Sequence, residues 1–334
     1  VIENYDMERI VDKWEALYNE FLKQKAINYE GWHLNKSISK IAIISPYARA
    51  ITTFRGHLIR KLVDSGIQVI VLAPDYTAKI KQEVQCLGAE PIDYALDRTG
   101  MNPLREIETL LSLVRLLREI RPDVVFGYNH KPVIYGTWAA RLAGVPLRFC
   151  MLEGLGFAFT PSHEFVLKRK FVRIVLWILY RLILPSASKT FFLNRDDLND
   201  FQQLGLISAD KSVLLGGIGV DLHEWAQLPP KVQTVTFTLA SRLLKEKGIM
   251  EFAEAARLVK SRYPNVRFLF LGGLDTNPGA ISEQVVSRWV NEDVLEWPGY
   301  VHDMKSYLAE TSVYVLPSYR EGVPRSTQEA MAAA

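Results

Sequence analysis

Short apolar runs rich in β-branched residues alternate with helical segments along the first half of the chain. Five of these runs have the length of a single buried strand and are predicted to be strands: 41–47, 68–74, 123–129, 146–152 and 189–194. Segment 103–120, between two of them, has helical spacing, with apolar side chains recurring on one face at Leu104, Ile107, Leu110, Leu111, Val114 and Leu117. This alternation predicts right-handed βαβ units and a parallel sheet.

A second series of the same kind follows the dipeptide Pro229-Pro230. Its strands are predicted at 234–243, 266–273, 294–300 and 313–318. Because the two prolines form a natural hinge, we predict an α/β fold of two Rossmann-like domains, 40–222 and 223–334. Their parallel sheets are expected to face a central cleft, with ligands bound at the carboxyl ends of the strands.

The two ends of the chain do not fit this plan. Residues 1–25 predict a separate amphipathic helix with Asp6 as its N-cap, and residues 26–39 predict a polar linker. The chain stops inside an apparent helix, so the predicted C-terminal domain is incomplete. We expect a piece of a longer polypeptide, with the first helix as the tail of an upstream unit; a permuted chain or an N-terminal docking helix are the alternatives.

Composition and charge disfavour several classes of protein. With 334 residues, 49% of them hydrophobic, the chain is long enough for two cores, and a net charge of +3 gives no general affinity for nucleic acid. Cys86 and Cys150 form no C-x-x-C pair, which disfavours both a disulfide framework and a metal knuckle. No uncharged apolar run reaches the about 20 residues of a membrane span.

Two enzyme classes with similar strand patterns are also disfavoured. A nicotinamide-dependent dehydrogenase needs G-x-G-x-x-G after a strand, whereas Gly154 and Gly156 are not followed by a third glycine in register. A metal-dependent transferase of the other common fold needs an Asp-x-Asp triplet, which does not occur in the sequence. We therefore predict no metal site.

Charged residues and glycines stand where ligands of the second domain are expected. Arg242 and Lys247 lie at the end of strand 234–243, and a guanidinium and an ammonium together suit a diphosphate. The alternative is a solvated helix start. Gly216, Gly217, Gly219 and Asp221 form a second element, in which glycines permit close approach of backbone N–H groups to phosphate or sugar, or form an interdomain turn.

The segment SYREGVPRSTQEA, residues 318–330, combines a loop and a helix start. Pro324 suits the first position of a helix, which would direct the N–H groups of Arg325 and Ser326 toward an anion. Glu321 on the loop and Glu329 in the helix suit neutral hydroxyl groups on either side. The alternative is a capped helix with an i,i+4 pair between Arg325 and Glu329.

Polar residues also follow two strands of the first domain. Strand 123–129 ends in Asn129, followed by His130 and Lys131, and strand 146–152 is followed by Glu153 and Gly154. Both groups are expected on the cleft side of the sheet. Arg55 is a further residue that is expected to face the cleft. The alternative for His130 is a purely structural role.

Segment 164–184 is almost wholly apolar but carries a basic stripe. Lys170, Arg173, Trp177 and Arg181 fall on one side of the predicted helix. This pattern suits a helix lying at a membrane surface, with lipid phosphates near the cations. A core helix with one solvated basic edge is the alternative.

Together these motifs resemble the retaining, GT-B-fold glycosyltransferases of family 4, from Ile41 to Ala334. The motifs that carry the resemblance are EGVPRSTQE, SRLLKEKG and GGIGVD, in the order and strand-end context of the family. The wording of NHKPVIYG, EGLGFAFT and SYREGVPRST is most similar to enzymes that extend polyprenyl-diphosphate-linked oligosaccharides for bacterial surface polysaccharides or glycoproteins. The loop SPYARAITTFRGH departs from the family because it lacks Gly-Gly after the first strand.

The resemblance implies a role for each site residue. Arg242 and Lys247 would hold the donor diphosphate, Glu321 the transferred sugar, and Glu329 the ribose. The donor would also contact the backbone of Gly322 and Val323, the start of the helix at Arg325 and Ser326, and Gly217 and Gly219. The acceptor would meet Asn129, Lys131, Glu153 and Gly154, with Lys131 at an acceptor phosphate, while His130 and Glu321 would lie at the reacting centre.

The resemblance also implies the reaction and its partners. A hexosyl or N-acetylhexosaminyl group would pass, with retained configuration, from a nucleoside-diphosphate sugar, expected to be UDP-linked, to a hydroxyl of a lipid-linked saccharide. No cofactor is implied, and the enzyme would be cytoplasmic, held at the inner face of the plasma membrane through 164–184. A non-catalytic nucleotide-sugar-binding scaffold or an inactive fragment is the alternative.

Overall fold

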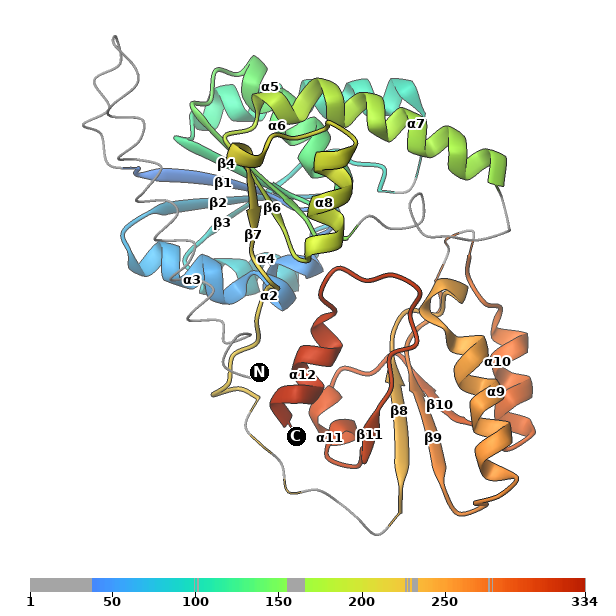
Figure 1. Cartoon of the computed structure of the whole chain (residues 1–334). Coiled ribbons are helices and arrows are strands. Elements are labelled where there is room, and N and C mark those ends of the chain that lie inside the picture. The colour runs from blue at the N-terminus through green and yellow to red at the C-terminus, as the bar shows by residue number, and fades with distance from the viewer. Residues whose placement is uncertain are drawn as a thin grey trace. The chain divides into compact units, whose positions relative to one another are not determined.

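The computed structural model describes residues 38–333 apart from 99, 101, 155–165, 226, 228, 230–233, 276 and 278, and for 166–169 the backbone alone. The predicted helix 1–25 and all but the last two residues of the predicted linker lie outside the described residues. The chain forms two compact units that divide between Ile218 and Gly219. Each unit is built on one parallel sheet (Figure 1).

The N-terminal unit contains a seven-stranded sheet in the order β3-β2-β1-β4-β5-β6-β7, with every neighbouring pair parallel. The strands are β1 Lys40–Ile44, β2 Gln68–Ala73, β3 Glu90–Asp93, β4 Val124–Tyr128, β5 Leu147–Leu152, β6 Lys189–Phe192 and β7 Ser212–Leu214. All five strands predicted in this half are present, which confirms the predicted parallel sheet.

Helices cover both faces of this sheet. They are α2 Arg49–Phe54, α3 Gly56–Asp64, α4 Ala78–Cys86, α5 Pro103–Ile120, α6 Thr137–Leu142, α7 Val166–Ile183 and α8 Arg195–Gln203. Figure 1 shows α5, α6 and α7 along one face and α2, α3 and α4 along the other. In the core on the α5 side, Leu113 and Leu117 of α5 pack with Ala139 of α6 on Ile44 and Leu72 of the sheet.

Two strands of this sheet, β3 and β7, were not predicted. Both lie at an edge, so each pairs on one side only. β3 has the polar sequence EPID, and its Pro91 is tolerated because an edge strand need not donate every N–H. β7 has three residues and none of them is fully buried. Neither strand therefore carries the apolar pattern that marks the central strands.

The buried face of α5 differs from the predicted one. The helix has the predicted bounds and begins after Asn102, whose side chain accepts a hydrogen bond from the N–H of Leu104. Val114 and Leu117 are buried as expected. The prediction was wrong for three residues of its apolar face, because Leu104, Ile107 and Leu111 are exposed. An 18-residue helix is about 27 Å long, whereas the five-residue strands span about 17 Å, so one end of α5 extends past the strands.

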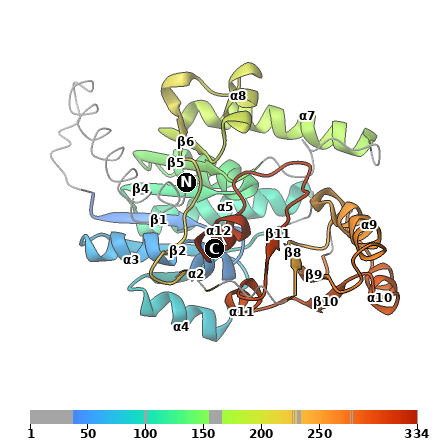
Figure 2. The same ribbon diagram turned by 60° about the horizontal axis from the view of Figure 1, so that its bottom comes forward.

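The C-terminal unit contains a four-stranded parallel sheet in the order β10-β9-β8-β11. Its strands are β8 Thr236–Ala240, β9 Arg267–Leu271, β10 Glu296–Gly299 and β11 Val313–Tyr314. Its helices are α9 Ile249–Lys260, α10 Glu283–Asn291, α11 Met304–Leu308 and α12 Arg325–Ala333. Figure 2 shows α9 and α10 on one face of the sheet and α11 and α12 on the other. All four strands predicted here are present, which confirms the α/β fold with two parallel sheets.

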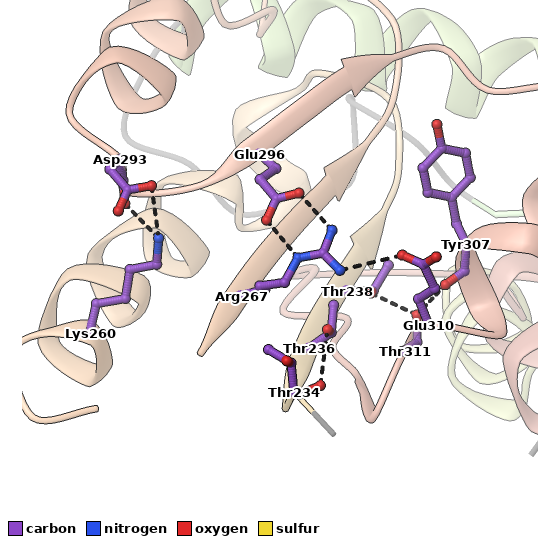
Figure 3. A network of polar contacts seen from close by, with 10 residues as sticks. All are labelled: Thr234, Thr236, Thr238, Lys260, Arg267, Asp293, Glu296, Tyr307, Glu310 and Thr311. Atoms are coloured by element: carbon purple, nitrogen blue, oxygen red, sulfur yellow. Dashed lines mark hydrogen bonds and ion pairs between the residues drawn. The ribbon is translucent and has the colours of Figure 1, made fainter. Parts of the chain in front are cut away.

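Polar contacts hold the amino ends of these strands together (Figure 3). Arg267, the first residue of β9, donates two hydrogen bonds to Glu296 of β10, at 2.8 and 2.7 Å, and one to Glu310 at 3.3 Å. The hydrogen bonds from Arg267 lower the pKa of Glu296. The amino edge of the sheet is thus closed by ion pairs, and the opposite, carboxyl edge carries the residues singled out in the sequence.

None of the helices in the described part of the chain is long and apolar enough to cross a membrane.

Candidate active site

Four charged residues of the C-terminal unit follow the carboxyl ends of its strands. Arg242 and Lys247 come after β8, Asp275 comes after β9, and Glu321 comes after β11. β8 lies between β9 and β11 in the sheet, so the loops that carry these residues are neighbours. The order of the strands therefore gathers two cations and two carboxylates at one edge.

Lys247 and Glu321 form an ion pair. The Lys247 Nζ lies 2.6 Å from the Glu321 Oε1, and the two side chains are 17% and 22% exposed. Lys247 ends the 3₁₀ turn η5 (Lys245–Lys247) and precedes Gly248, which has a φ of 72°. A Cβ on Gly248 would lie 2.3 Å from the Pro317 carbonyl oxygen, so only glycine allows the two loops to approach this closely.

Arg242 is paired with an acid that the sequence analysis did not single out. Its Nη1 lies 3.1 Å from the Asp275 Oδ2; Arg242 is 60% exposed, whereas Asp275 is 7% exposed. Asp275 also accepts hydrogen bonds from the backbone and side chain of Asn277. The buried carboxylate thus fixes an arginine that reaches into solvent, and its place just after β9 is the signal that could have identified it.

The start of α12 contains the i,i+4 ion pair between Arg325 and Glu329, which the sequence analysis gave as the alternative to ligand binding. Arg325 Nε donates to Glu329 Oε1 at 2.8 Å, and both side chains are largely buried. Burial raises the pKa of Glu329, and the neighbouring Arg325 works against that shift. Ser326 Oγ donates to the Ala240 carbonyl at 3.3 Å, which attaches the first turn of α12 to the end of β8.

Gln328 connects two of the predicted motifs. It is almost fully buried, its Oε1 accepts a hydrogen bond from the Gly219 N–H at 3.0 Å, and its Nε2 donates to the Val323 carbonyl at 3.3 Å. Gly219 has a φ of 74°. Its partner stands 109 residues further along the chain, so no local pattern could have indicated Gln328. Gly217 is buried, has a φ of 128°, and lies in the N-terminal unit.

In the N-terminal unit, Glu153 and Asn129 stand side by side after β5 and β4. Asn129 has a φ of 71°, and its Nδ2 donates to the Glu153 Oε2 at 2.9 Å. The other carboxylate oxygen pairs with Arg55 Nη2. Arg55 is 3% exposed and lies over the Tyr128 ring, with its guanidinium carbon 4.4 Å from the ring centroid. Arg55 stands at the break between α2 and α3, which lets a helical residue reach the edge of the sheet.

The surroundings of His130 favour a neutral imidazole. Its Nδ1 lies 2.5 Å from the hydroxyl of Tyr180 on α7, and burial lowers the pKa of His130 to about 4. Burial also raises the pKa of Tyr180, so that hydroxyl stays protonated. His130 precedes the π-helical turn η2 (Pro132–Gly136), a conformation found frequently at functional sites. Tyr180 is a partner that the sequence analysis missed.

The buried imidazole predicts a pH-dependent stability. The unfolded chain protonates His130 near pH 6.5, whereas the folded chain resists protonation down to about pH 4. His130 is therefore neutral in both states above pH 6.5. As the pH falls from 6.5 to 4, its burial lowers the free energy of unfolding by up to about 3 kcal/mol.

Urea unfolding at pH 7 and pH 4.5 checks this expectation. The stability gap between the wild type and His130→Asn should shrink by roughly 2–3 kcal/mol at the lower pH. Tyr180→Phe keeps the buried imidazole and is expected to retain the pH dependence of the wild type. A gap that does not change with pH would show that burial of His130 does not govern its titration.

The ammonium of Lys131 donates hydrogen bonds to three oxygen atoms of the protein. It donates to the carbonyls of Asp97 and Gly100, at 2.5 and 2.7 Å, and to the Glu106 carboxylate. An ammonium has three N–H bonds, and here three oxygens receive them. An acceptor phosphate at Lys131 remains a prediction, and it now requires one of these bonds to break. Gly154 follows Glu153 with a φ of 153°.

Each unit thus presents a different chemistry at the carboxyl edge of its sheet. The C-terminal unit offers two cations beside the start of a helix, a combination that suits a diphosphate. The N-terminal unit offers a carboxylate, an amide and a neutral imidazole, which suit neutral hydroxyl groups.

Two protein-family models match the chain, one in each half. A model of the "glycosyl transferase 4-like domain" family matches residues 49–216, and a model of "glycosyl transferases group 1" matches residues 234–334.

Two curated relatives are bacterial glycosyltransferases. One is the N,N'-diacetylbacillosaminyl-diphospho-undecaprenol alpha-1,3-N-acetylgalactosaminyltransferase of Campylobacter jejuni, 29% identical over 88% of this chain and 78% of the relative. The other is the UDP-Gal:alpha-D-GlcNAc-diphosphoundecaprenol alpha-1,3-galactosyltransferase of Escherichia coli, 28% identical over 68% of this chain and 60% of the relative.

Solved structures show the same fold. The sucrose-phosphate synthase of Thermosynechococcus elongatus has a TM-score of 0.67 at 17% identity, covering 88% of this chain and 79% of that one. A glycosyltransferase from Rickettsia africae has a TM-score of 0.60 at 15% identity, covering 85% and 74%. The first family model covers half of the sequence and the second most of the remainder, so the chain belongs to the glycosyl transferase 4-like family and is a glycosyltransferase of the GT-B fold.

Proposed function

We propose that this glycosyltransferase moves a hexosyl or N-acetylhexosaminyl group from a UDP-sugar to a hydroxyl of a polyprenyl-diphosphate-linked saccharide, with retained configuration. The observation that carries the proposal is the meeting of Lys247 and Glu321 at the carboxyl edge of β8 and β11, beside Arg242 and the start of α12. Both curated relatives are named for acceptors in which a sugar is joined to undecaprenol through a diphosphate.

When the donor binds, we expect the ammonium of Lys247 to leave Glu321 and pair with the diphosphate. In the free chain this ammonium is neutralised by Glu321. A bound diphosphate carries more negative charge than a single carboxylate, so it draws the ammonium away and frees Glu321 for the hydroxyls of the sugar. Arg242 adds a second positive charge, and the N–H groups at the start of α12 face the phosphates. Because protein cations supply this charge, the proposal requires no metal ion or cofactor.

During transfer, the bond between the anomeric carbon and the diphosphate oxygen breaks, and a bond to the acceptor oxygen forms on the same face. The proton of the acceptor hydroxyl leaves with the diphosphate. The main contribution of the protein is to stabilise the negative charge that develops on the leaving diphosphate. Glu153 and Asn129 orient the acceptor hydroxyl, and the neutral His130 borders the reacting centre without adding charge.

α7 provides a surface for the membrane that carries the acceptor. Four of its apolar side chains, at helical spacing, are 45–60% exposed: Phe171, Ile174, Ile178 and Leu182. Trp177 is exposed beside them, and Lys170, Arg173 and Arg181 flank the stripe. A core helix would bury such a stripe, so the exposure favours a helix that lies in a membrane interface, and we assign it to the inner face of the plasma membrane.

A donor screen tests the proposed reaction. The chain is incubated with UDP- and GDP-sugars and a polyprenyl-diphosphate-linked saccharide, and the products are identified by mass spectrometry. We expect the acceptor to gain the mass of one hexose or N-acetylhexosamine from a UDP-sugar. Calorimetric binding of UDP without any transfer would instead favour a non-catalytic nucleotide-sugar-binding scaffold, and a folded chain that binds neither UDP nor GDP would contradict the proposal.

Glu321→Gln distinguishes the effect of this site on sugar transfer from its effect on nucleotide binding. The variant keeps the shape of the side chain but loses its charge, so hydrogen bonds to the sugar hydroxyls weaken and the transfer rate should fall roughly ten- to hundredfold. UDP affinity should not fall, because Lys247 no longer has to leave a carboxylate. Glu329→Gln is the contrasting variant, in which calorimetry should show weaker UDP binding. Equal losses of UDP affinity in both variants would contradict these separate roles.

A further inference from the structure

A cavity of about 310 Å³ lies in the N-terminal unit, away from the carboxyl edge of its sheet. Its wall consists of the last turn of α7, the 3₁₀ turn η3 (Leu184–Ser186), and the loop from Gly205 to Lys211 that connects α8 with β7. η3 leads into β6, and the loop leads into β7. The cavity is therefore at the amino ends of these strands, on the opposite edge from Glu153 and Asn129.

Two cations line this cavity, and neither is ion-paired with a carboxylate of the residues that the structure describes. Arg181 Nη1 donates to the Gly205 carbonyl, and Lys211 Nζ donates to the Pro185 carbonyl at 2.5 Å. Across the described residues, the ion pairs within 4.0 Å include neither Arg181 nor Lys211. Carbonyl oxygens orient these side chains but leave their full positive charge in place.

The carboxylate next to Lys211 in sequence does not cancel this charge. Asp210 is exposed, and a hydrogen bond from Ser208, followed by the charges of Lys211 and Lys189, lowers its pKa. Lys189 also donates to the Asp210 carbonyl at 2.7 Å. Lys189 and Lys211 thus act on one acid and Arg181 adds a third cation, so the cavity and its rim carry a net positive charge.

Apolar side chains surround the cations. Leu184, Leu206 and Ile207 are buried in the cavity wall. Leu182 and Leu204, each next to a lining segment in sequence, are about half exposed. Leu182 is also the last member of the exposed stripe on α7. A cationic pocket whose rim is continuous with an exposed apolar stripe matches a molecule with an anionic head and an apolar tail.

We propose that this cavity binds the phosphate of an anionic phospholipid headgroup, with Leu182 and Leu204 at the boundary of the acyl chains. The proposal rests on the membrane surface assigned above to α7 and adds a lipid class and a site to it. The site is at the opposite edge of the sheet from the proposed acceptor residues, so it would hold the enzyme on the membrane while the acceptor edge stays available.

Vesicle binding tests the proposal with the intact chain. Wild type and Arg181→Gln/Lys211→Gln are sedimented with phosphatidylcholine vesicles and with vesicles containing 30% phosphatidylglycerol. Near an anionic surface each cation contributes roughly a fivefold factor in binding, so the double variant should bind the anionic vesicles roughly 25-fold more weakly. Binding to phosphatidylcholine should not change, because α7 keeps its apolar stripe.

Arg60→Gln/Lys79→Gln is the matched control. It removes one arginine and one lysine from exposed positions on α3 and α4, on the other face of the sheet. This control should bind anionic vesicles within about twofold of the wild type. An equal loss in both double variants would mean that net charge, not the cavity, governs binding, and this result would overturn the site. If the wild type binds neither kind of vesicle, the membrane surface on α7 is overturned as well. The proposed sugar transfer is tested separately, with an acceptor dispersed in detergent.

A second measurement uses the wild type alone and so does not depend on how the variants fold. Hydrogen exchange is followed in dihexanoyl-phosphatidylglycerol and in inorganic phosphate at the same concentration. We expect slower exchange in segment 204–211 with the short-chain lipid only. Equal protection by inorganic phosphate would identify a free-phosphate site, and no protection by either would leave the cavity without an anionic ligand; both results would overturn the proposal.

Discussion

Lys247→Ala is expected to lower the rate of sugar transfer roughly 100- to 1,000-fold at saturating donor. The ammonium is only 17% exposed, and its charge is therefore less screened by water than that of the 60% exposed Arg242. Its contribution should grow as the sugar departs, because negative charge accumulates on the leaving diphosphate. The loss should therefore fall on the transfer step more than on UDP affinity.

Single-turnover kinetics with a UDP-sugar, together with calorimetry of UDP binding, measure the two effects separately. Lys245→Ala is the matched control, since Lys245 belongs to the same 3₁₀ turn and is exposed; it should transfer sugar at close to the wild-type rate. Arg242→Ala should be intermediate, because its guanidinium is more solvated. Wild-type transfer by Lys247→Ala at saturating donor would remove the ammonium from the proposed mechanism.

The same substitution has a structural consequence that must be measured alongside. Without Lys247, the Glu321 carboxylate stays three-quarters buried and loses its contact with the Lys247 ammonium. Thermal unfolding of Lys247→Ala/Glu321→Gln, in which both charges are removed, separates a loss of catalysis from a loss of folded protein. If this double variant regains the stability of the wild type yet transfers sugar much more slowly than Glu321→Gln alone, the catalytic role of Lys247 stands.

The sequence could identify the residues that directly follow a predicted strand, because ligands of parallel sheets bind at the carboxyl ends of the strands. Arg242, Lys247 and Glu321 each follow a strand whose apolar pattern is clear, and parallel sheets gather such residues at one edge. The same rule placed Asn129 and Glu153 after β4 and β5. In these cases the local sequence determines the strand, and the topology of the sheet then determines the position of the residue.

The partners of these residues could not be predicted in the same way. Tyr180 is 50 residues from His130, and Gln328 is 109 residues from Gly219. Such pairs depend on how helices pack against the sheet, and the apolar periodicity of a helix defines its buried face only approximately. The buried face of α5, which differs from the predicted one, is an example. The sequence therefore indicates which groups carry the chemistry, whereas the packing decides which of them are already paired.

Lys131 is an example of a predicted binding residue that is already paired in the folded chain. Its substitution is therefore expected to lower the free energy of unfolding by a large amount. The Lys131–Glu106 pair is 20% and 14% exposed, and the ammonium also joins the Asp97 and Gly100 carbonyls to β4. Lys131→Met leaves the Glu106 carboxylate without its cation and two carbonyls without their donor. We expect the free energy of unfolding to fall by about 3 kcal/mol, in the range found when one partner of a buried pair is removed.

Urea unfolding of a short series of variants decides between this structural role and the predicted contact with an acceptor phosphate. Lys131→Met/Glu106→Gln should recover part of the lost stability, since no unpaired charge remains. Arg115→Met, which breaks the exposed pair with Glu119 on the same helix as Glu106, should show no measurable loss. If Lys131→Met instead unfolds like the wild type but needs much more lipid-linked acceptor to reach half its maximal rate, the ammonium is released from Glu106 in the complex and binds the acceptor.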